Sequence, residues 1–198
     1  MTAGFLEDAP LSPQAQALYD EDLNESGYVW NVSHLWAYQP DTMESLFELM
    51  SQAFKRSDLA FRQRGILVTA AASTLGDSYC SLAWGGKLAG ASDPTLAAEV
   101  LNGTDTSLTD QEKAMASWAR KVVKDPNAIT PADLQELRDA GLSDAQIFAI
   151  TTFVALRAAF STINDALGAS PDTQLVASLP PAVTQAVTYG RPPHPSAP

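Results

Sequence analysis

The chain has 198 residues, of which 23 are acidic and 12 are basic, so its formal charge is −11. A chain of this length corresponds to one domain that buries about 70% of the surface exposed on unfolding, and its core needs no metal or disulfide. Cys80 is the only cysteine. The sequence therefore excludes zinc clusters, iron–sulfur clusters and disulfide frameworks, which need several soft ligands. Intrachain dithiol chemistry is excluded for the same reason, and we expect no metal and no cofactor.

Acidic residues are concentrated in the first quarter of the chain. Residues 1–50 hold nine acids and no Lys or Arg, whereas residues 51–198 hold 14 acids and 12 bases. Nucleic acids and anionic membranes require clustered cations, which this chain lacks. We therefore expect neither as a partner, and we interpret the acidic end as a solvated helix face.

The sequence contains no recognisable targeting segment or membrane span. The first residues lack both a basic start and an apolar run, which a secretory signal would show. The longest apolar stretch, Ile147–Phe160, is shorter than the ~20 residues that a bilayer requires, and it contains Arg157. We expect a cytoplasmic protein without a membrane partner, in which this stretch is a buried core helix.

Helix signals follow one another along the chain, and strand signals are almost absent. Ser12-Pro13 and Thr130-Pro131 have the sequence of a capping residue followed by proline at the first helical position. Ser57 is expected to cap another helix, and residues 28–38 form a short apolar segment. The expected helices span about 13–26, 40–54, 59–75, 79–88, 94–102, 110–124, 131–140 and 144–167.

Two features depart from this regular pattern. Gly85-Gly86 lies inside an expected helix, where each glycine costs about 1 kcal/mol relative to Ala, so either the helix breaks or another segment packs closely against it. After residue 172 the chain is rich in proline, which favours an extended arm or a disordered end. The sequence predicts an all-α single domain over residues 1–172 and a Pro-rich C-terminal extension over residues 173–198.

The candidate site lies in residues 61–90, where a buried helix, a glycine turn and a new helix place Cys80 in a first helical turn. A helix N-terminus lowers the pKa of a thiol and favours the thiolate. Asp77 has the opposite effect, because its carboxylate would cap the Cys80 amide and repel a second anion. Trp84 follows one turn after Cys80 and shares its helix face. The alternative interpretation is that Cys80 and Trp84 are simply core residues.

This stretch resembles the carboxymuconolactone decarboxylase superfamily, in its alkylhydroperoxidase D-like and peroxidase-related branch. The family pattern is a Glu, eleven residues, and then Cys-x-x-Cys-x-x-x-His, and its four positions hold Gly65, Asp77, Cys80 and Trp84 here. The lead-in at residues 27–50 and the segment 108–156 are also similar to the family, so the resemblance covers most of residues 27–172. It implies a helical bundle of the alkylhydroperoxidase D-like type.

The resemblance also implies a function, which the departures restrict. The family's antioxidant peroxidase cycle uses a nucleophilic Cys, a resolving Cys and a Glu–His proton relay, and its members assemble as dimers, trimers or hexamers. Asp77 cannot resolve a sulfenic acid, and Trp84 cannot relay a proton. What remains is one-cysteine chemistry, in which an external thiol reduces the oxidised Cys80. Lys87 is the only cation close to Cys80 in the sequence, and we interpret it as solvated.

Three hypotheses remain open. The first is a peroxidase-related oxidoreductase that uses Cys80 alone. The second is a cofactor-free, decarboxylase- or lyase-like enzyme for small organic acids or metabolites, with Asp77 as general acid or base in a pocket walled by Tyr79 and Trp84. The third is a non-catalytic homo-oligomer or ligand-binding protein. His34, the only histidine outside the tail, is either structural or part of the substrate pocket.

Overall fold

The computed structural model describes residues 4–195, and these are predominantly helical, with no named strand. Within them, the only isolated β-type pairing is one bridge between Asp172 and His194. The all-α prediction is therefore confirmed. The helices are α1 (Pro13–Ser26), α2 (Asn31–Trp36), α3 (Pro40–Lys55), α4 (Phe61–Leu75), α5 (Ser78–Ala91), α6 (Pro94–Asn102), α7 (Asp110–Lys124), the 3-10 turn Pro126–Ala128, α8 (Pro131–Asp139), α9 (Asp144–Ala166), α10 (Thr173–Ser178) and α11 (Pro181–Ala186).

Local capping signals mark several of the helix boundaries. The Ser12 hydroxyl accepts a hydrogen bond from the Ala15 amide at the start of α1, and Gly27 ends that helix in the left-handed conformation. Thr109 and Glu112 form a reciprocal capping box at the start of α7. Because these contacts link residues close together in the sequence, the boundaries could be predicted without tertiary information.

One predicted helix start is wrong, and one helix was not predicted. Helix α4 begins after Ala60, and the hydroxyl of Ser57 instead donates to the Phe54 carbonyl at the end of α3, at 2.6 Å. Residues 31–36 form α2, where we predicted only an apolar segment. A helix of six residues is too short to show the periodic pattern on which the prediction depends.

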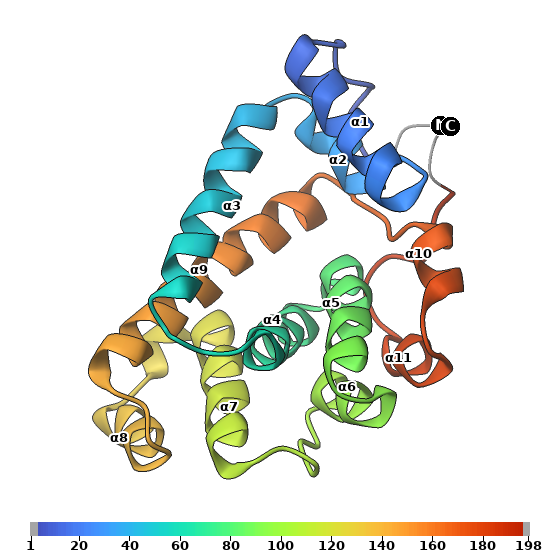
Figure 1. The fold of residues 1–198 in the computed structure, drawn as a ribbon. Helices are drawn as coiled ribbons and strands as arrows, with labels where there is room; N and C mark the ends of the chain where they lie inside the picture. Colours follow the sequence, from blue (N-terminus) through green and yellow to red (C-terminus); the bar gives the residue numbers. More distant parts are fainter. Residues whose placement is uncertain (1–3, 196–198) are drawn as a thin grey trace.

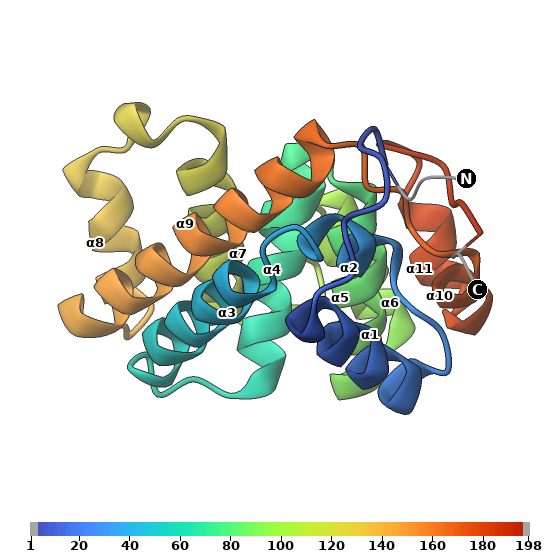
Figure 2. The same ribbon diagram turned by 90° about the horizontal axis from the view of Figure 1, so that it is seen from above.

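Helix α4 lies at the centre of the bundle. It packs against α5, α6, α7 and α9, and Figure 1 shows it nearly end-on with these helices around it. Every residue from Gly65 to Ala72 is buried, as expected for a helix that is covered on all sides. Helix α3 contacts α9, and the view from above shows the two helices beside each other (Figure 2).

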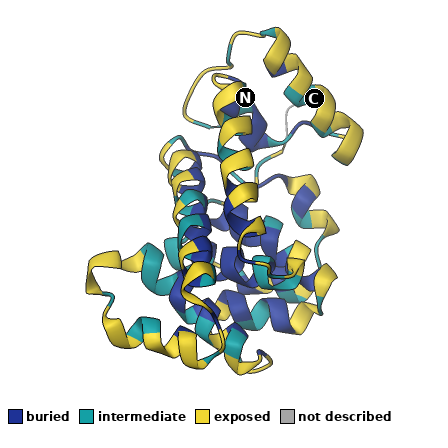
Figure 3. Ribbon diagram, turned by 60° about the vertical axis from the view of Figure 1, so that its left-hand side comes forward, coloured by how far each residue is buried: buried dark blue, intermediate teal, exposed yellow. Residues whose placement is uncertain are grey.

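Helix α9 is long and apolar enough to cross a membrane by length and composition alone. In the structure it packs against α3, α4 and α7. Ile150, Phe153 and Val154 on α9 are fully buried. The helices of the bundle carry their buried residues on inward faces and their exposed residues on the outside (Figure 3). The prediction of a core helix at this position is therefore confirmed.

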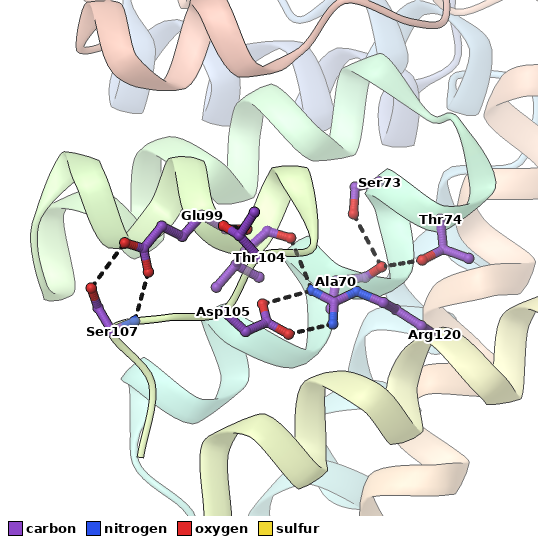
Figure 4. A network of polar contacts seen from close by, with 9 residues as sticks. Ala70, Ser73, Thr74, Glu99, Thr104, Asp105, Ser107 and Arg120 are labelled. Atoms are coloured by element: carbon purple, nitrogen blue, oxygen red, sulfur yellow. Dashed lines mark hydrogen bonds and ion pairs between the residues drawn. The ribbon is translucent and has the colours of Figure 1, made fainter. Parts of the chain in front are cut away.

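An ion pair fixes the connection between α6 and α7 (Figure 4). Arg120 on α7 contacts both carboxylate oxygens of Asp105, at 2.5 and 2.9 Å, and donates to the Val100 carbonyl at 3.0 Å. Glu99 on α6 accepts hydrogen bonds from the amide and hydroxyl of Ser107. Asp105 has a positive φ of 51°, and its contacts with Arg120 hold the turn in this conformation.

The glycine pair in α5 does not break the helix. It provides a surface against which the C-terminal helices pack. A Cβ atom on Gly85 would lie 2.9 Å from Cγ1 of Val183, and one on Gly86 would collide with Leu179. Val183 is fully buried in the main core. The expectation of an extended or disordered arm is therefore wrong for residues 173–186, which form α10 and α11 and pack against α5 and α6.

Candidate functional site

A cavity of about 860 Å³ lies between α1–α3 on one side and α4, α5 and α9 on the other. Its wall includes Cys80, Tyr79 and Trp84 from α5, Phe47 from α3 and Phe160 from α9. Acidic side chains also line it, and all but one of them are exposed, so they mark its mouth: Glu21, Asp22, Glu25, Asp41, Glu44 and Glu48. The cavity thus has an aromatic interior and an acidic rim.

Cys80 contributes to the cavity wall although only 2% of its surface is exposed. Asp77 is the N-cap of α5, and its Oδ1 accepts from the Cys80 amide at 2.9 Å. On the other side, Nη2 of Arg157 on α9 lies 3.5 Å from the Cys80 Sγ atom as a donor. Burial raises the pKa of the Cys80 thiol, the Asp77 charge raises it further, and Arg157 opposes both. The resting group at neutral pH is therefore the thiol.

Three cationic side chains of the cavity lining surround the Trp84 ring, and of these Arg157 is buried, Arg64 is partly buried and Lys87 is exposed. Arg64 Cζ, Lys87 Nζ and Arg157 Cζ lie 5.2, 5.0 and 5.3 Å from the ring centroid. Burial lowers the pKa of Arg64 and of Lys87, and the neighbouring charge of Arg157 lowers both further. The exposed side chain of Lys87 agrees with the expectation that this residue is solvated. The sequence does not indicate that Arg64 and Arg157 lie beside it, because they come from two other helices, α4 and α9.

The structure brings three of the five predicted site residues together at the cavity. Tyr79 lines it beside Cys80 and Trp84, and its hydroxyl donates to Asp172 at 2.5 Å. Asp77 is fully buried and does not line the cavity. His34 does not line it either.

His34 packs against α1 instead. Its ring centroid lies 5.1 Å from that of Tyr19, and burial lowers the pKa of its imidazole. Among residues 4–195 its Nε2 atom has no hydrogen-bond partner. This placement fits the structural alternative better than a role in the substrate pocket.

Gly65 occupies the position at which the resembling family has a glutamate. It is buried on α4, and a Cβ atom there would meet Leu88 of α5 at 3.2 and 3.3 Å. A longer side chain would force α4 and α5 apart, because Leu88 is itself fully buried. The local packing therefore leaves no room for a relay carboxylate.

Metal ligands do not gather in the described part of the chain. No group of three or more His, Cys, Asp or Glu side chains within it could hold an ion. The groups that could hold a ligand are the cations and aromatic rings of the cavity.

Solved structures with the same architecture identify the fold. An uncharacterized peroxidase-related protein with an alkylhydroperoxidase AhpD core, from Ralstonia eutropha JMP134, matches with a TM-score of 0.76 and 21% identity over 98% of this chain and 100% of its own. A peroxidase-related protein from Silicibacter sp. TM1040 matches with a TM-score of 0.78 and 20% identity over 88% and 95%. The protein has the alkylhydroperoxidase D-like fold.

The AhpD-like fold also occurs in the debrominase Bmp8. Its apo structure matches with a TM-score of 0.70 and 16% identity, covering 89% of this chain and 96% of its own. A cysteine-to-alanine variant of Bmp8 in complex with 2,3,4-tribromopyrrole matches with a TM-score of 0.71 and 14% identity over 91% and 97%. No protein-family profile and no curated protein matches the sequence. These neighbours agree with the resemblance to the carboxymuconolactone decarboxylase superfamily, and at such identities they show the fold alone.

Proposed function

We propose that the protein is a one-cysteine oxidoreductase that acts at Cys80 on a small molecule bound in the cavity. The observation that carries this proposal is the position of the Cys80 sulfur on the cavity wall, with the Arg157 guanidinium 3.5 Å away. A cation at that distance stabilises a thiolate, which is the reactive form of cysteine. The peroxidase-related neighbours support a redox role for the fold.

The proposed cycle uses a peroxide and an external thiol. The Cys80 thiolate attacks one oxygen of a hydroperoxide, the O–O bond breaks, and the second oxygen leaves as an alcohol after taking up the proton that the thiol lost. An external thiol then displaces water from the sulfenic acid, and a second one releases Cys80 as a thiol. Each turnover reduces one peroxide and oxidises two external thiols to a disulfide.

The electrostatics of the site determine the rate of sulfenic acid formation at neutral pH. Because burial and Asp77 raise the pKa of the Cys80 thiol, the thiolate is a small fraction at neutral pH. Below the thiol pKa, the rate of sulfenic acid formation should therefore rise about tenfold for each pH unit. Asp77 caps α5 and lies outside the cavity lining, so we do not assign it the role of general acid or base.

Trapping the sulfenic acid tests the proposal. The protein is treated with cumene hydroperoxide in the presence of dimedone between pH 7 and 9, and the adduct is located by mass spectrometry. We expect one dimedone on Cys80, formed faster at higher pH, and none in Cys80→Ser. No adduct at pH 9 under a large excess of peroxide would rule out the oxidoreductase.

The second candidate is a ligand-binding protein without turnover. It is favoured by the raised pKa of the Cys80 thiol and by the packing of Leu88 at the Gly65 position. Dimedone trapping together with a calorimetric titration of benzoate separates the two candidates, because an unreactive Cys80 in a cavity that still binds benzoate selects the binding protein.

We also propose that the protein forms a homo-oligomer and works as a soluble, cytoplasmic protein. Large apolar side chains on its surface outside the cavity support association, since Phe148 is 75% exposed and Leu49 is 52% exposed. Analytical ultracentrifugation should show a dimer, trimer or hexamer, and a monomer at micromolar concentration would contradict the assembly.

A further inference from the structure

We infer that Arg64, Lys87 and Arg157 form an anion subsite in the cavity, which takes the carboxylate of an organic monoanion. The apolar body of that ligand would lie against the aromatic rings of the cavity wall. The inference deepens the proposed function and rests on it for the reaction, because it names the class of molecule that Cys80 meets. The binding itself does not depend on turnover.

The three cations lack an anionic partner within residues 4–195. The ion pairs of the described chain use other basic residues: Arg62, Lys113, Arg120, Lys121 and Arg138. The hydrogen bonds of Arg157 reach only two sulfur atoms, Sγ of Cys80 at 3.5 Å and Sδ of Met50 at 3.9 Å. Sulfur is a weak acceptor, so neither contact balances a full positive charge.

The burial of Arg157 makes this lack of a partner significant. Only 4% of the Arg157 surface is exposed, and its Nε atom is buried without a hydrogen-bond partner. Arg64 also lines the cavity and is only partly buried, but its Nε atom is likewise buried without a hydrogen-bond partner. A buried guanidinium is normally paired, because removing an isolated charge from water is costly. One buried, unpaired guanidinium beside a second, partly buried one in the same cavity wall indicates that the compensating anion comes from a ligand.

The acids around the cavity do not provide that anion. Glu25 is near enough to oppose the lowering of the Lys87 pKa, but it lies on the exposed rim. Asp22 is the half-buried acid of the rim, and its carboxylate already accepts from the Trp30 amide at 3.0 Å. The acids of the rim therefore leave Arg64 and Arg157 uncompensated, and they repel ligands that carry several negative charges.

The shape and lining of the cavity specify the rest of the ligand. A volume of about 860 Å³ is within the range of small-molecule sites, and it greatly exceeds what a simple inorganic anion fills. Phe47, Phe61, Trp84 and Phe160 offer ring surfaces to an apolar body. A single carboxylate matches the planar donors of Arg64 and Arg157. With Cys80 in the same wall, the substrate class for turnover is a hydroperoxide that bears one carboxylate.

Calorimetric titration with benzoate and benzamide tests the subsite, because the two probes share size and ring but differ in charge. We expect benzoate to bind wild-type protein at least tenfold more tightly than benzamide. Arg157→Met should weaken benzoate binding at least tenfold and leave benzamide binding unchanged. The control Arg56→Met removes the same charge from an exposed site outside the cavity and should change neither affinity more than twofold.

Three outcomes would overturn the inference. These are equal affinity for benzoate and benzamide, no saturable benzoate binding, or an equal loss of benzoate affinity in Arg157→Met and Arg56→Met. Displacement of benzoate by an equimolar amount of inorganic phosphate would also contradict an organic ligand. Should Arg157→Met fail to fold, Lys87→Met at the exposed rim should weaken benzoate binding at least threefold. Cys80→Ser separates the two proposals, because it should bind benzoate like wild type whether or not Cys80 forms a sulfenic acid.

Discussion

The sulfur of Cys80 lies between two opposite electrostatic influences. Asp77 approaches it from the helix cap and Arg157 approaches it from α9, and burial adds to the effect of the acid. Because Asp77 both caps α5 and disfavours the thiolate, substitutions at this position can separate stability from reactivity.

Asp77→Asn should keep the cap and remove the charge. We expect the free energy of unfolding to change by less than ~1 kcal/mol, since Asn caps helices as well as Asp. The pKa of the Cys80 thiol should fall, so its reaction with an alkylating reagent should speed up several-fold at pH 8. Asp77→Ala should instead lose about 1–2 kcal/mol of stability with the cap. Urea unfolding and alkylation rates measure the two effects, and a slower reaction in Asp77→Asn would contradict this account.

Arg157→Met should stabilise the free protein. The substitution removes an unpaired buried charge and fits an apolar chain between Trp84 and Phe160, at the cost of two cation–π contacts. We expect the free energy of unfolding to rise by about 1 kcal/mol, because replacing buried ionic groups with apolar ones is often stabilising. Chemical denaturation of wild type and Arg157→Met without ligand measures this difference in the free energy of unfolding. A clear loss of stability would mean that Arg157 is a structural residue.

Sequence reasoning found the part of the site that is local in the chain. Cys80, its cap Asp77 and its neighbour Trp84 belong to one helix start, so their relation follows from helix geometry. The cationic part was missed because Arg157 reaches Cys80 across 77 residues of sequence. The only local signal is that Arg157 interrupts an otherwise apolar run, which argues against a membrane span but does not indicate Cys80 as its neighbour. The catalytic and binding roles of these residues stay predictions.

Among the elements, α5 shows how glycines can select a packing partner. Gly85 and Gly86 face Val183 and Leu179, whereas a Cβ atom added to Gly90 in the same helix would have nothing within 4 Å. The three positions therefore share a helix but differ in their surroundings, which makes them matched test sites.

Gly85→Ala should destabilise the protein by about 1–3 kcal/mol, because the added methyl group overpacks the contact with Val183 and Leu101. Gly90→Ala should stabilise it by up to about 1 kcal/mol through helix propensity alone. For Gly86→Ala the clash involves the flexible end of Leu179, so Leu179→Ala in the same chain should recover part of the loss. Thermal unfolding of the variants compares these effects, and equal shifts at Gly85 and Gly90 would contradict the packing role.

The elements were predicted best where a helix carries its own start and stop signals. Pro94–Asn102 was predicted with the observed bounds, because Asp93 caps it and Gly103 ends it. The C-terminal helices were missed because proline composition indicates an unpacked tail, whereas in the structure they pack against the Gly85-Gly86 surface on α5 and against α6. That surface was recognised in the sequence, but nothing there identified the segment that covers it.

At the scale of the whole molecule, two carboxyl groups give the stability opposite dependences on pH. Burial raises the pKa of Asp165 to about 6, the charge of Asp77 adds to this, and Arg191 opposes it. The hydrogen bond from Arg62 lowers the pKa of Glu112. Glu112 therefore contributes stability that is lost as the pH falls below its ordinary range of about 4.5. Because the pKa of Asp165 is higher in the folded protein, its ionisation lowers the free energy of unfolding as the pH rises from about 4 to 6.

Asp165→Asn should therefore stabilise the protein above pH 6 and have little effect near pH 4. The gain at pH 8 should be about 1 kcal/mol, a figure reduced for solvent screening because the side chain is half-exposed. The hydrogen bond from Arg191 is made to the backbone carbonyl of residue 165 and survives the change. Denaturant unfolding at pH 4, 6 and 8 measures the difference, and a gain that is equal at all three values would refute the assignment.

The acidic rim of the cavity has a kinetic consequence. A monoanion that moves toward Arg157 must first pass exposed carboxylates on α1 and α3, and their repulsion is screened within about 10 Å at 0.1 M salt. Added salt should therefore accelerate the association of benzoate, whereas it slows the capture of anions by most cationic sites. The same rim should slow the escape of a bound anion in dilute solution. The protein would then exchange its ligand faster as the ionic strength of its surroundings rises.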